Sequence, residues 1–162
     1  MKTILIVTIF ELFILYGARV CSAEETDITY TVKGIELIDD QDLKSSVLKY
    51  LRLREDLNYM KLYDCLSKNY LAQRFPDITK ADQYSNTMND YSEISMMKYL
   101  EIFSVKIVDK DTSRIGIIYE SISEEMHYKI KNIYVFVKEG NTWKYDGMDL
   151  ESREILSQRE VY

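Results

Sequence analysis

Two polar side chains lie at alternate positions otherwise occupied by apolar residues in the last third of the sequence, Glu101 and Asn132. Glu101 comes two residues after Tyr99, so a regular strand would direct both side chains to one face. A carboxylate there, beside a tyrosine that donates a hydrogen bond, could abstract a proton next to a carbonyl group. The other reading is that a β-bulge shifts the register and turns Glu101 to solvent.

The other reactive residue types favour structural roles. His127 alternates with Lys129 and Lys131, so we expect its side chain to face water. One histidine without clustered cysteines gives little from which to build a zinc site. Cys65 fits a small buried residue on a helix face better than a nucleophile. We find no glycine-rich phosphate loop, Gly-x-Ser-x-Gly elbow, Cys-x-x-Cys pair or EF-hand loop, and expect no metal and no cofactor.

The elements that would position Glu101 and Asn132 are four strands between Lys98 and Leu150. Apolar residues alternate with polar ones in each run, and the last run, with Trp143 and Tyr145 on one parity, is expected to end at Gly147. The connections at 109–113, 121–125 and 139–141 are rich in turn-forming residues and too short for a crossover helix. The strands should therefore pair antiparallel.

Helical spacing of apolar residues precedes the strands. A first helix is expected to begin near Asp42, and a second to run from Tyr59 to Tyr70 after an Asn or Asp cap. Phe75 and Pro76 should stop the second helix, and a short third helix could lie within 77–95. These elements predict an α+β domain over 42–150, with two helices and a short third one packed on a curved four-stranded antiparallel sheet.

The flanking segments carry weaker signals. Residues 24–41 are expected to form an extended arm or edge strand, and 151–162 a charged, frayed helical tail. Residues 1–23 have the layout of a secretory signal peptide, with cleavage near Ala23 and a secreted or periplasmic product. An uncleaved membrane anchor and a lipid-modified Cys21 remain alternatives.

The charge of the chain excludes some partners. The sequence has 27 acidic and 21 basic residues, a formal charge of −6, and loss of residues 1–23 makes the charge more negative by one. An acidic surface disfavours nucleic acid and anionic lipid as partners. Cleavage also removes Cys21, which leaves Cys65 alone and rules out an internal disulfide.

Two stretches carry a family resemblance. The run 46–71, with its Glu-Asp-Leu-Asn hinge and Leu-Ser-Lys-Asn-Tyr ending, resembles the helical opening of the NTF2-like, cystatin-like superfamily. The run 134–145, in which a tryptophan follows a Glu-Gly turn, looks like the last hairpin of that fold. The resemblance implies a cone-shaped domain. Members of this superfamily include isomerases, dehydratases and hydrolases, and also proteins that only bind a ligand or dimerise through the sheet.

These observations favour a secreted or periplasmic, non-catalytic domain that binds a small apolar ligand or a protein partner. An enzyme of the isomerase or dehydratase kind with Glu101 as base is one alternative, and an immunity or inhibitor protein with an acidic binding surface is another. A homodimer through the outward residues Ile133, Val135 and Val137 would suit the fold. The candidate ligand-binding residues are Tyr99, Glu101, Tyr128, Asn132, Tyr134 and Trp143.

Overall fold

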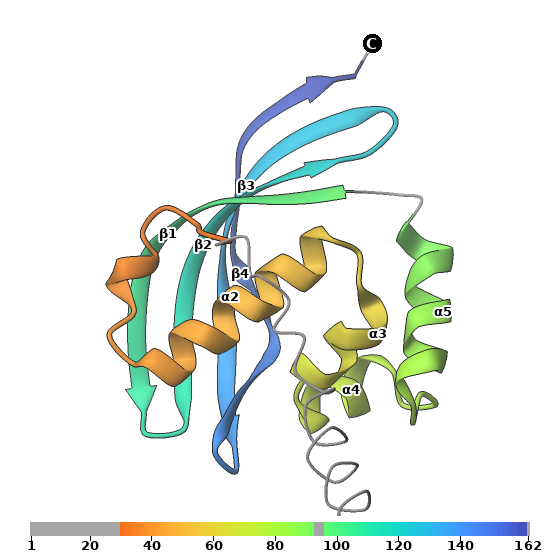
Figure 1. Cartoon of the computed structure of the whole chain (residues 1–162). Helices are drawn as coiled ribbons and strands as arrows, with labels where there is room; N and C mark the ends of the chain where they lie inside the picture. Colours follow the sequence, from red (N-terminus) through yellow and green to blue (C-terminus); the bar gives the residue numbers. More distant parts are fainter. Residues whose placement is uncertain (1–29, 93–95, 162) are drawn as a thin grey trace, which may run out of the picture. The chain divides into compact units, whose positions relative to one another are not determined.

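The computed structural model describes residues 30–92 and 96–161 of the chain, which form helices packed on one side of a bent sheet (Figure 1). The predicted signal peptide, its cleavage site and Cys21 lie outside these residues. Within them, no helix is both long and apolar enough to cross a membrane. The helical elements are η1 (Ile35–Leu37), α2 (Gln41–Glu55), α3 (Tyr59–Leu62), η2 (Tyr63–Cys65), α4 (Lys68–Arg74) and α5 (Ala81–Ser92). The strands are β1 (Met96–Asp109), β2 (Thr112–Ile122), β3 (Met126–Glu139) and β4 (Thr142–Glu160).

Helix α2 is the long helix that lies across the sheet. Its N-cap is Asp40, whose side chain accepts a hydrogen bond of 2.9 Å from the Leu43 amide. This satisfies one of the amides left free at the helix start. The apolar stripe is buried, with Val47 and Leu51 fully inaccessible to solvent. The predicted first helix is therefore confirmed, and its stripe faces the sheet.

The predicted second helix is wrong as a single element, because the chain breaks it into α3, η2 and α4. The break comes at Ser67, whose amide donates to the carbonyl of Tyr145 in β4 at 2.9 Å. The Ser67 hydroxyl accepts from the Tyr70 amide at 2.8 Å and caps α4. A tertiary hydrogen bond and a new N-cap at this point thus replace the continuous helix. Helix α4 ends at Arg74, just before Phe75 and Pro76, as predicted.

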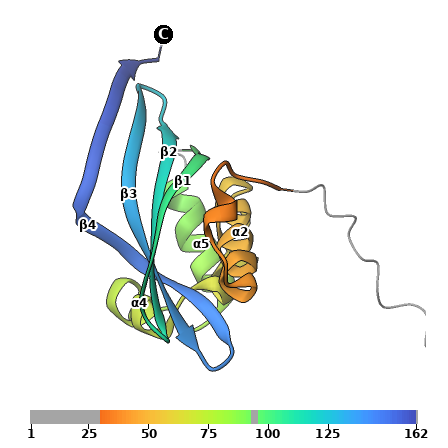
Figure 2. The same ribbon diagram turned by 90° about the vertical axis from the view of Figure 1, so that its left-hand side faces the viewer.

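The four strands form a meander in the order β1-β2-β3-β4 with antiparallel pairing throughout, as expected. Side chains on one face of the sheet are buried against the helices, including Ile117 and Tyr134. We call this the inner face. In the view turned by 90°, α2 and α5 lie on one side of β1 to β3, and the C-terminal part of β4 bends away from the helices (Figure 2).

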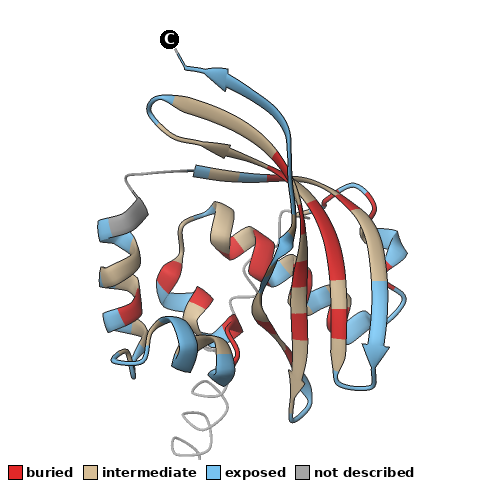
Figure 3. Ribbon diagram, turned by 180° about the vertical axis from the view of Figure 1, so that it is seen from behind, coloured by how far each residue is buried: buried red, intermediate tan, exposed pale blue. Residues whose placement is uncertain are grey.

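The expected end of the fourth strand at Gly147 is wrong, and so is the helical tail over 151–162. Strand β4 passes through Gly147, which has φ of +126°, and continues to Glu160 along β3. The extra length is held by ladder pairing and by an ion pair of 3.2 Å between Lys131 and Glu154. Its residues are mostly exposed, as the pale blue end of β4 shows (Figure 3).

The segment before α2 crosses the edge of β1. Lys33 forms a single parallel bridge with Glu101, and its carbonyl accepts from the Ile102 amide at 2.7 Å. Gly34 follows with φ of +80°, a conformation that glycine adopts without steric cost. A Cβ atom at Gly34 would collide with the Ile102 carbonyl, so this position requires a glycine both for its φ and for its close backbone approach.

Candidate ligand-binding site

Aromatic side chains fill the space between the helices and the inner face of the sheet. Rings from both layers contact one another at centroid distances of 4.2 to 6.4 Å, mostly edge to face, which is a favourable geometry for aromatic pairs. We call these residues the aromatic cluster. Its members are Tyr50, Tyr59, Tyr63, Tyr70, Phe75, Tyr84, Tyr99, Tyr119, Tyr134, Phe136 and Tyr145.

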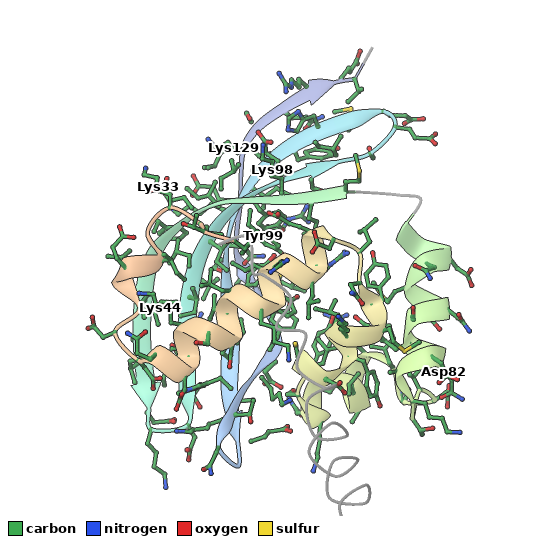
Figure 4. The ribbon with its side chains drawn as sticks, in the orientation of Figure 1. Lys33, Lys44, Asp82, Lys98, Tyr99 and Lys129 are labelled. Carbon is green, nitrogen blue, oxygen red and sulfur yellow. The ribbon has the colours of Figure 1, made fainter. Side chains whose placement is uncertain are left out.

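The deep part of the cluster carries its hydroxyl groups inside. Tyr134 is 1% exposed, and its hydroxyl lies 3.4 Å from that of Tyr99, which is also buried. Tyr99 projects from β1 towards the helical layer (Figure 4). Hydroxyl groups in an apolar interior need partners, and here they supply one another. The deep part is therefore a polar patch enclosed by rings.

Burial holds these hydroxyl groups in their neutral form. Burial is the largest cause that raises the pKa of Tyr50, Tyr99, Tyr134 and Tyr145, and the charges of neighbouring tyrosines raise it further in each of the four. Hydrogen bonds from Tyr134 to Tyr99 and from Tyr50 to Tyr145 act to lower the pKa, but less than burial raises it. A neutral phenol with a raised pKa donates a hydrogen bond but gives up its proton reluctantly. The deep part is thus suited to hydrogen bonding and poorly suited to proton transfer near neutral pH.

Three members of the cluster keep part of their surface in solvent, namely Tyr63, Tyr70 and Phe75. We call them the aromatic rim. Phe75 contacts Tyr70 at 6.1 Å and Tyr84 at 5.1 Å between ring centroids, and Tyr63 contacts Tyr84 at 5.8 Å. The rim is therefore continuous with the buried rings, and it is the part of the cluster that a ligand in solution can touch.

Arg54, in the last turn of α2, brings a positive charge to the cluster. Its Nη1 donates a hydrogen bond of 2.8 Å to the Tyr59 hydroxyl, and its guanidinium carbon lies 5.4 Å from the centroid of that ring. The same charge acts to lower the pKa of Tyr70, Tyr84 and Tyr99, against the larger effect of burial. Arg54 therefore lies near rings of both the rim and the deep part.

The acidic residues next to Arg54 are engaged elsewhere. Glu55 accepts a hydrogen bond from the backbone amide of Tyr99, and Asp56 pairs with Arg52 at 3.7 Å. None of the ion pairs among residues 30–92 and 96–161 includes Arg54. The half-buried guanidinium is thus held by a phenol and not by a carboxylate.

The structure brings together three of the six residues expected at the ligand site. Tyr99, Asn132 and Tyr134 all lie on the inner face, and Asn132 is 0% exposed. The Asn132 side-chain oxygen accepts from the Ser152 hydroxyl at 3.0 Å. Tyr128 shares the parity of Asn132 and Tyr134 on β3, but it lies opposite Gln158 near the far end of the sheet. It is therefore on the same face and away from the helices.

Glu101 does not take the inward position that simple alternation gives it. The register of β1 shifts between Tyr99 and Glu101, so that Tyr99 pairs with Tyr119 and Glu101 with Ile118. Ile118 belongs to the outer face, because its neighbours Ile117 and Tyr119 are buried inside. Glu101 forms an ion pair of 3.1 Å with Lys33. The alternative prediction, in which a β-bulge turns Glu101 away from the inner face, is therefore the one observed.

Trp143 is also apart from the deep hydroxyl groups. It is 3% exposed and lies beside Lys138, whose Nζ is 5.7 Å from the ring centroid, in the β3–β4 hairpin. Its indole nitrogen has no hydrogen-bond partner among the described residues. Trp143 therefore packs at the hairpin end of the core and is not a neighbour of Tyr99.

His127 lies on the outer face, but the expectation that it faces water is wrong in detail. Its side chain is only 12% exposed and lies between Glu120, at 3.4 Å from Nε2, and Arg159, whose Nε donates to Nδ1 at 2.9 Å. Cys65 is buried, as expected, and burial raises the pKa of its thiol. No group of three potential metal ligands occurs within the described part of the chain.

The sequence reasoning missed Arg54 and the rim. A signal for Arg54 was present, because it follows Val47 by seven residues and Tyr50 by four, which places it on the buried stripe of α2. The sequence predicts Tyr63 and Tyr70 within a helix and Phe75 at its end, and nothing in their spacing indicates that α4 and α5 bring Phe75 against Tyr84. That contact depends on tertiary packing.

Comparisons with known proteins support the fold. No protein-family model and no curated protein matches this chain. A solved structure of a putative scytalone dehydratase from Novosphingobium aromaticivorans is similar with a TM-score of 0.51 and 11% identity, over 79% of this chain and 91% of that one. An LEH-like epoxide hydrolase of M. tuberculosis has a TM-score of 0.46 and 12% identity, over 67% of this chain and 83% of that one.

A domain of unknown function with a cystatin-like fold from Nostoc punctiforme also has a TM-score of 0.46 and 12% identity, over 70% of this chain and 80% of that one. The first likeness agrees with the observed order of helices followed by a curved antiparallel sheet. The chain therefore has the NTF2-like fold that the sequence resemblance implied. At this identity the likeness bears on fold and not on activity.

Proposed function

We propose that this chain is an exported, non-catalytic domain of NTF2-like fold that binds a small ligand with an apolar or aromatic body against the aromatic rim. The observation that carries the proposal is the continuity of three partly exposed rings with a large buried cluster. Ligand sites are lined mostly by apolar and aromatic side chains, and a few polar groups then fix the orientation of the ligand.

The composition of the buried residues favours binding over acid–base catalysis. Among the described residues, the buried polar side chains are Ser67, Ser113 and Asn132, with no carboxylate and no imidazole. General acid–base catalysis needs a group that exchanges a proton near the working pH. The buried tyrosines do not meet this need, and Glu101 is paired with Lys33 on the other face. The isomerase or dehydratase alternative therefore loses its base.

Binding can be tested with N-phenyl-naphthylamine, a neutral aromatic dye that fluoresces in apolar surroundings. We expect saturable binding to the folded chain, and a loss of about tenfold or more in affinity for Phe75→Ala, because a buried aromatic contact contributes about 1.5–3 kcal/mol. Phe103→Ala is the matched control. Phe103 is also half-buried, but it covers Gly116 on the outer face.

Two results would contradict the proposal. One is the absence of saturable dye binding, and the other is an equal effect of Phe75→Ala and Phe103→Ala. Circular dichroism of both variants would show that each remains folded. Export is tested separately by expressing the full chain and sequencing the N-terminus of the product, which we expect to begin at Glu24.

A further inference from the structure

We propose that the ligand carries an anionic group, a carboxylate or sulfonate, next to its apolar body, and that Arg54 binds this group at the aromatic rim. The inference rests on the proposed function, since it names the class of ligand for the same site. It adds one charged contact to a surface that is otherwise aromatic.

The first step is that the charge of Arg54 has no counter-ion among residues 30–92 and 96–161. The guanidinium is half-buried, and no described carboxylate forms an ion pair with it. A guanidinium has five N–H donors, and the contacts given for Arg54 use one of them, towards the Tyr59 hydroxyl. Donors therefore remain for a bidentate contact with an incoming anion, the geometry for which arginine is best suited.

The second step is the position of Arg54 relative to the rim. Tyr59, which holds the guanidinium, contacts Tyr84 at 6.4 Å, and Tyr84 contacts Phe75 at 5.1 Å and Tyr63 at 5.8 Å. Two buried rings, Tyr59 and Tyr84, thus connect the guanidinium to the rim, and its charge also acts to lower the pKa of Tyr70, a rim residue. An amphiphilic anion that extends from the rim to Arg54 can therefore engage both the aromatic surface and the charge.

The third step is that the net charge of the chain disfavours non-specific anion binding. The chain has a formal charge of −6, so a simple inorganic anion meets net repulsion at a distance. A ligand that also buries apolar surface on the rim gains enough to overcome this repulsion. The site should therefore select organic anions over inorganic ones.

A matched pair of dyes tests the inference. Anilinonaphthalene sulfonate and N-phenyl-naphthylamine share one aromatic skeleton and differ by the sulfonate. We expect Arg54→Gln to weaken binding of the sulfonate dye about tenfold or more, the usual effect of losing a charge-assisted hydrogen bond, and to change binding of the neutral dye less than about twofold. Arg54→Lys should keep part of the affinity because it keeps the charge.

Lys110→Gln is the control for net charge, because Lys110 is 90% exposed in the β1–β2 turn and far in sequence from the rim. It should leave both dyes unaffected. The salt dependence of the unmodified protein gives a measurement that needs no variant. Rising ionic strength should weaken binding of the sulfonate dye and leave the neutral dye unchanged.

The outcomes separate the two proposals. If the neutral dye binds and Phe75→Ala weakens it, while Arg54→Gln and salt have no selective effect on the sulfonate dye, the anion inference is overturned and the proposed function stands. If neither dye binds the unmodified protein, the proposed function fails, and the anion inference fails with it. A selective loss for the sulfonate dye on Arg54→Gln supports both.

Discussion

Raising the pH should unfold this domain in a steep transition, because of its buried tyrosines. Burial is the largest cause that raises the pKa of seven of them above the ordinary value of 10.0. They are Tyr50, Tyr70, Tyr84, Tyr99, Tyr119, Tyr134 and Tyr145. A pKa that is higher in the folded state favours the folded state while the groups are protonated. This stability is fully present below the unfolded pKa and is lost as the pH rises above it.

The expected magnitude follows from linkage. With an unfolded pKa of about 10, one such tyrosine costs about 0.4 kcal/mol of folding free energy at about pH 10 and about 1.4 kcal/mol at about pH 11. Seven of them together cost up to about 3 and about 10 kcal/mol at these two pH values. Domains of this size are typically stable by about 5–15 kcal/mol, so we expect unfolding between about pH 10 and pH 11.5.

Two signals measured together test this prediction. The absorbance of tyrosinate reports ionisation, and far-ultraviolet circular dichroism reports secondary structure. In the folded chain, ionisation of the cluster should coincide with loss of structure, in one cooperative step. The same titration in concentrated urea gives the reference, where tyrosines should ionise gradually around pH 10. Full ionisation of the tyrosines in a chain that keeps its circular dichroism would refute the reasoning, because the hydroxyl groups would then be accessible to solvent.

Two substitutions test the elements that frame the site. Ser67→Ala removes the N-cap of α4 and should lower the free energy of unfolding by about 1–2 kcal/mol. The control Ser45→Ala, at an exposed position, should change it by less than about 0.5 kcal/mol. Equal effects of the two substitutions in urea titrations would contradict the role of the cap. Gly34→Ala should lower it by at least about 2 kcal/mol, because φ is +80° and the new Cβ would meet the backbone carbonyl of Ile102. In Gly116→Ala the new Cβ would meet only side chains, so this substitution should lower the free energy of unfolding by less than Gly34→Ala does. A larger loss for Gly116→Ala in the same titration would show that the segment around Gly34 is not fixed against β1.

The sheet was predictable from sequence where one face is buried, and not elsewhere. In β3 the alternation of Ile130, Asn132 and Tyr134 with outward residues matches the observed burial. The last ten residues of β4 have no such pattern, because neither of their faces is covered by a helix. Backbone hydrogen bonds to β3 hold these residues in place, and backbone hydrogen bonds do not require a particular pattern of residue types.

The position of Glu101 could not be predicted, for a related reason. One extra residue in β1 reverses the direction of the side chains that follow it, up to the next register shift between Ile102 and Ser104, and a bulge has no required residue type here. The burial of Ile102, which follows the shift, is the visible consequence. A catalytic role inferred from strand parity therefore requires a regular register, and in β1 the register changes at Glu101.

The position of Arg54 explains how the fold keeps a positive charge next to its core when no carboxylate of the described residues pairs with it. Removing a guanidinium from water is unfavourable, yet Arg54 is in the last turn of α2, where the helix dipole presents partial negative charge. The Tyr59 hydroxyl and ring face add further negative potential. These groups stabilise the cation but do not neutralise its charge, whereas a bound carboxylate would neutralise it. The charge therefore remains available to an anion that approaches the rim.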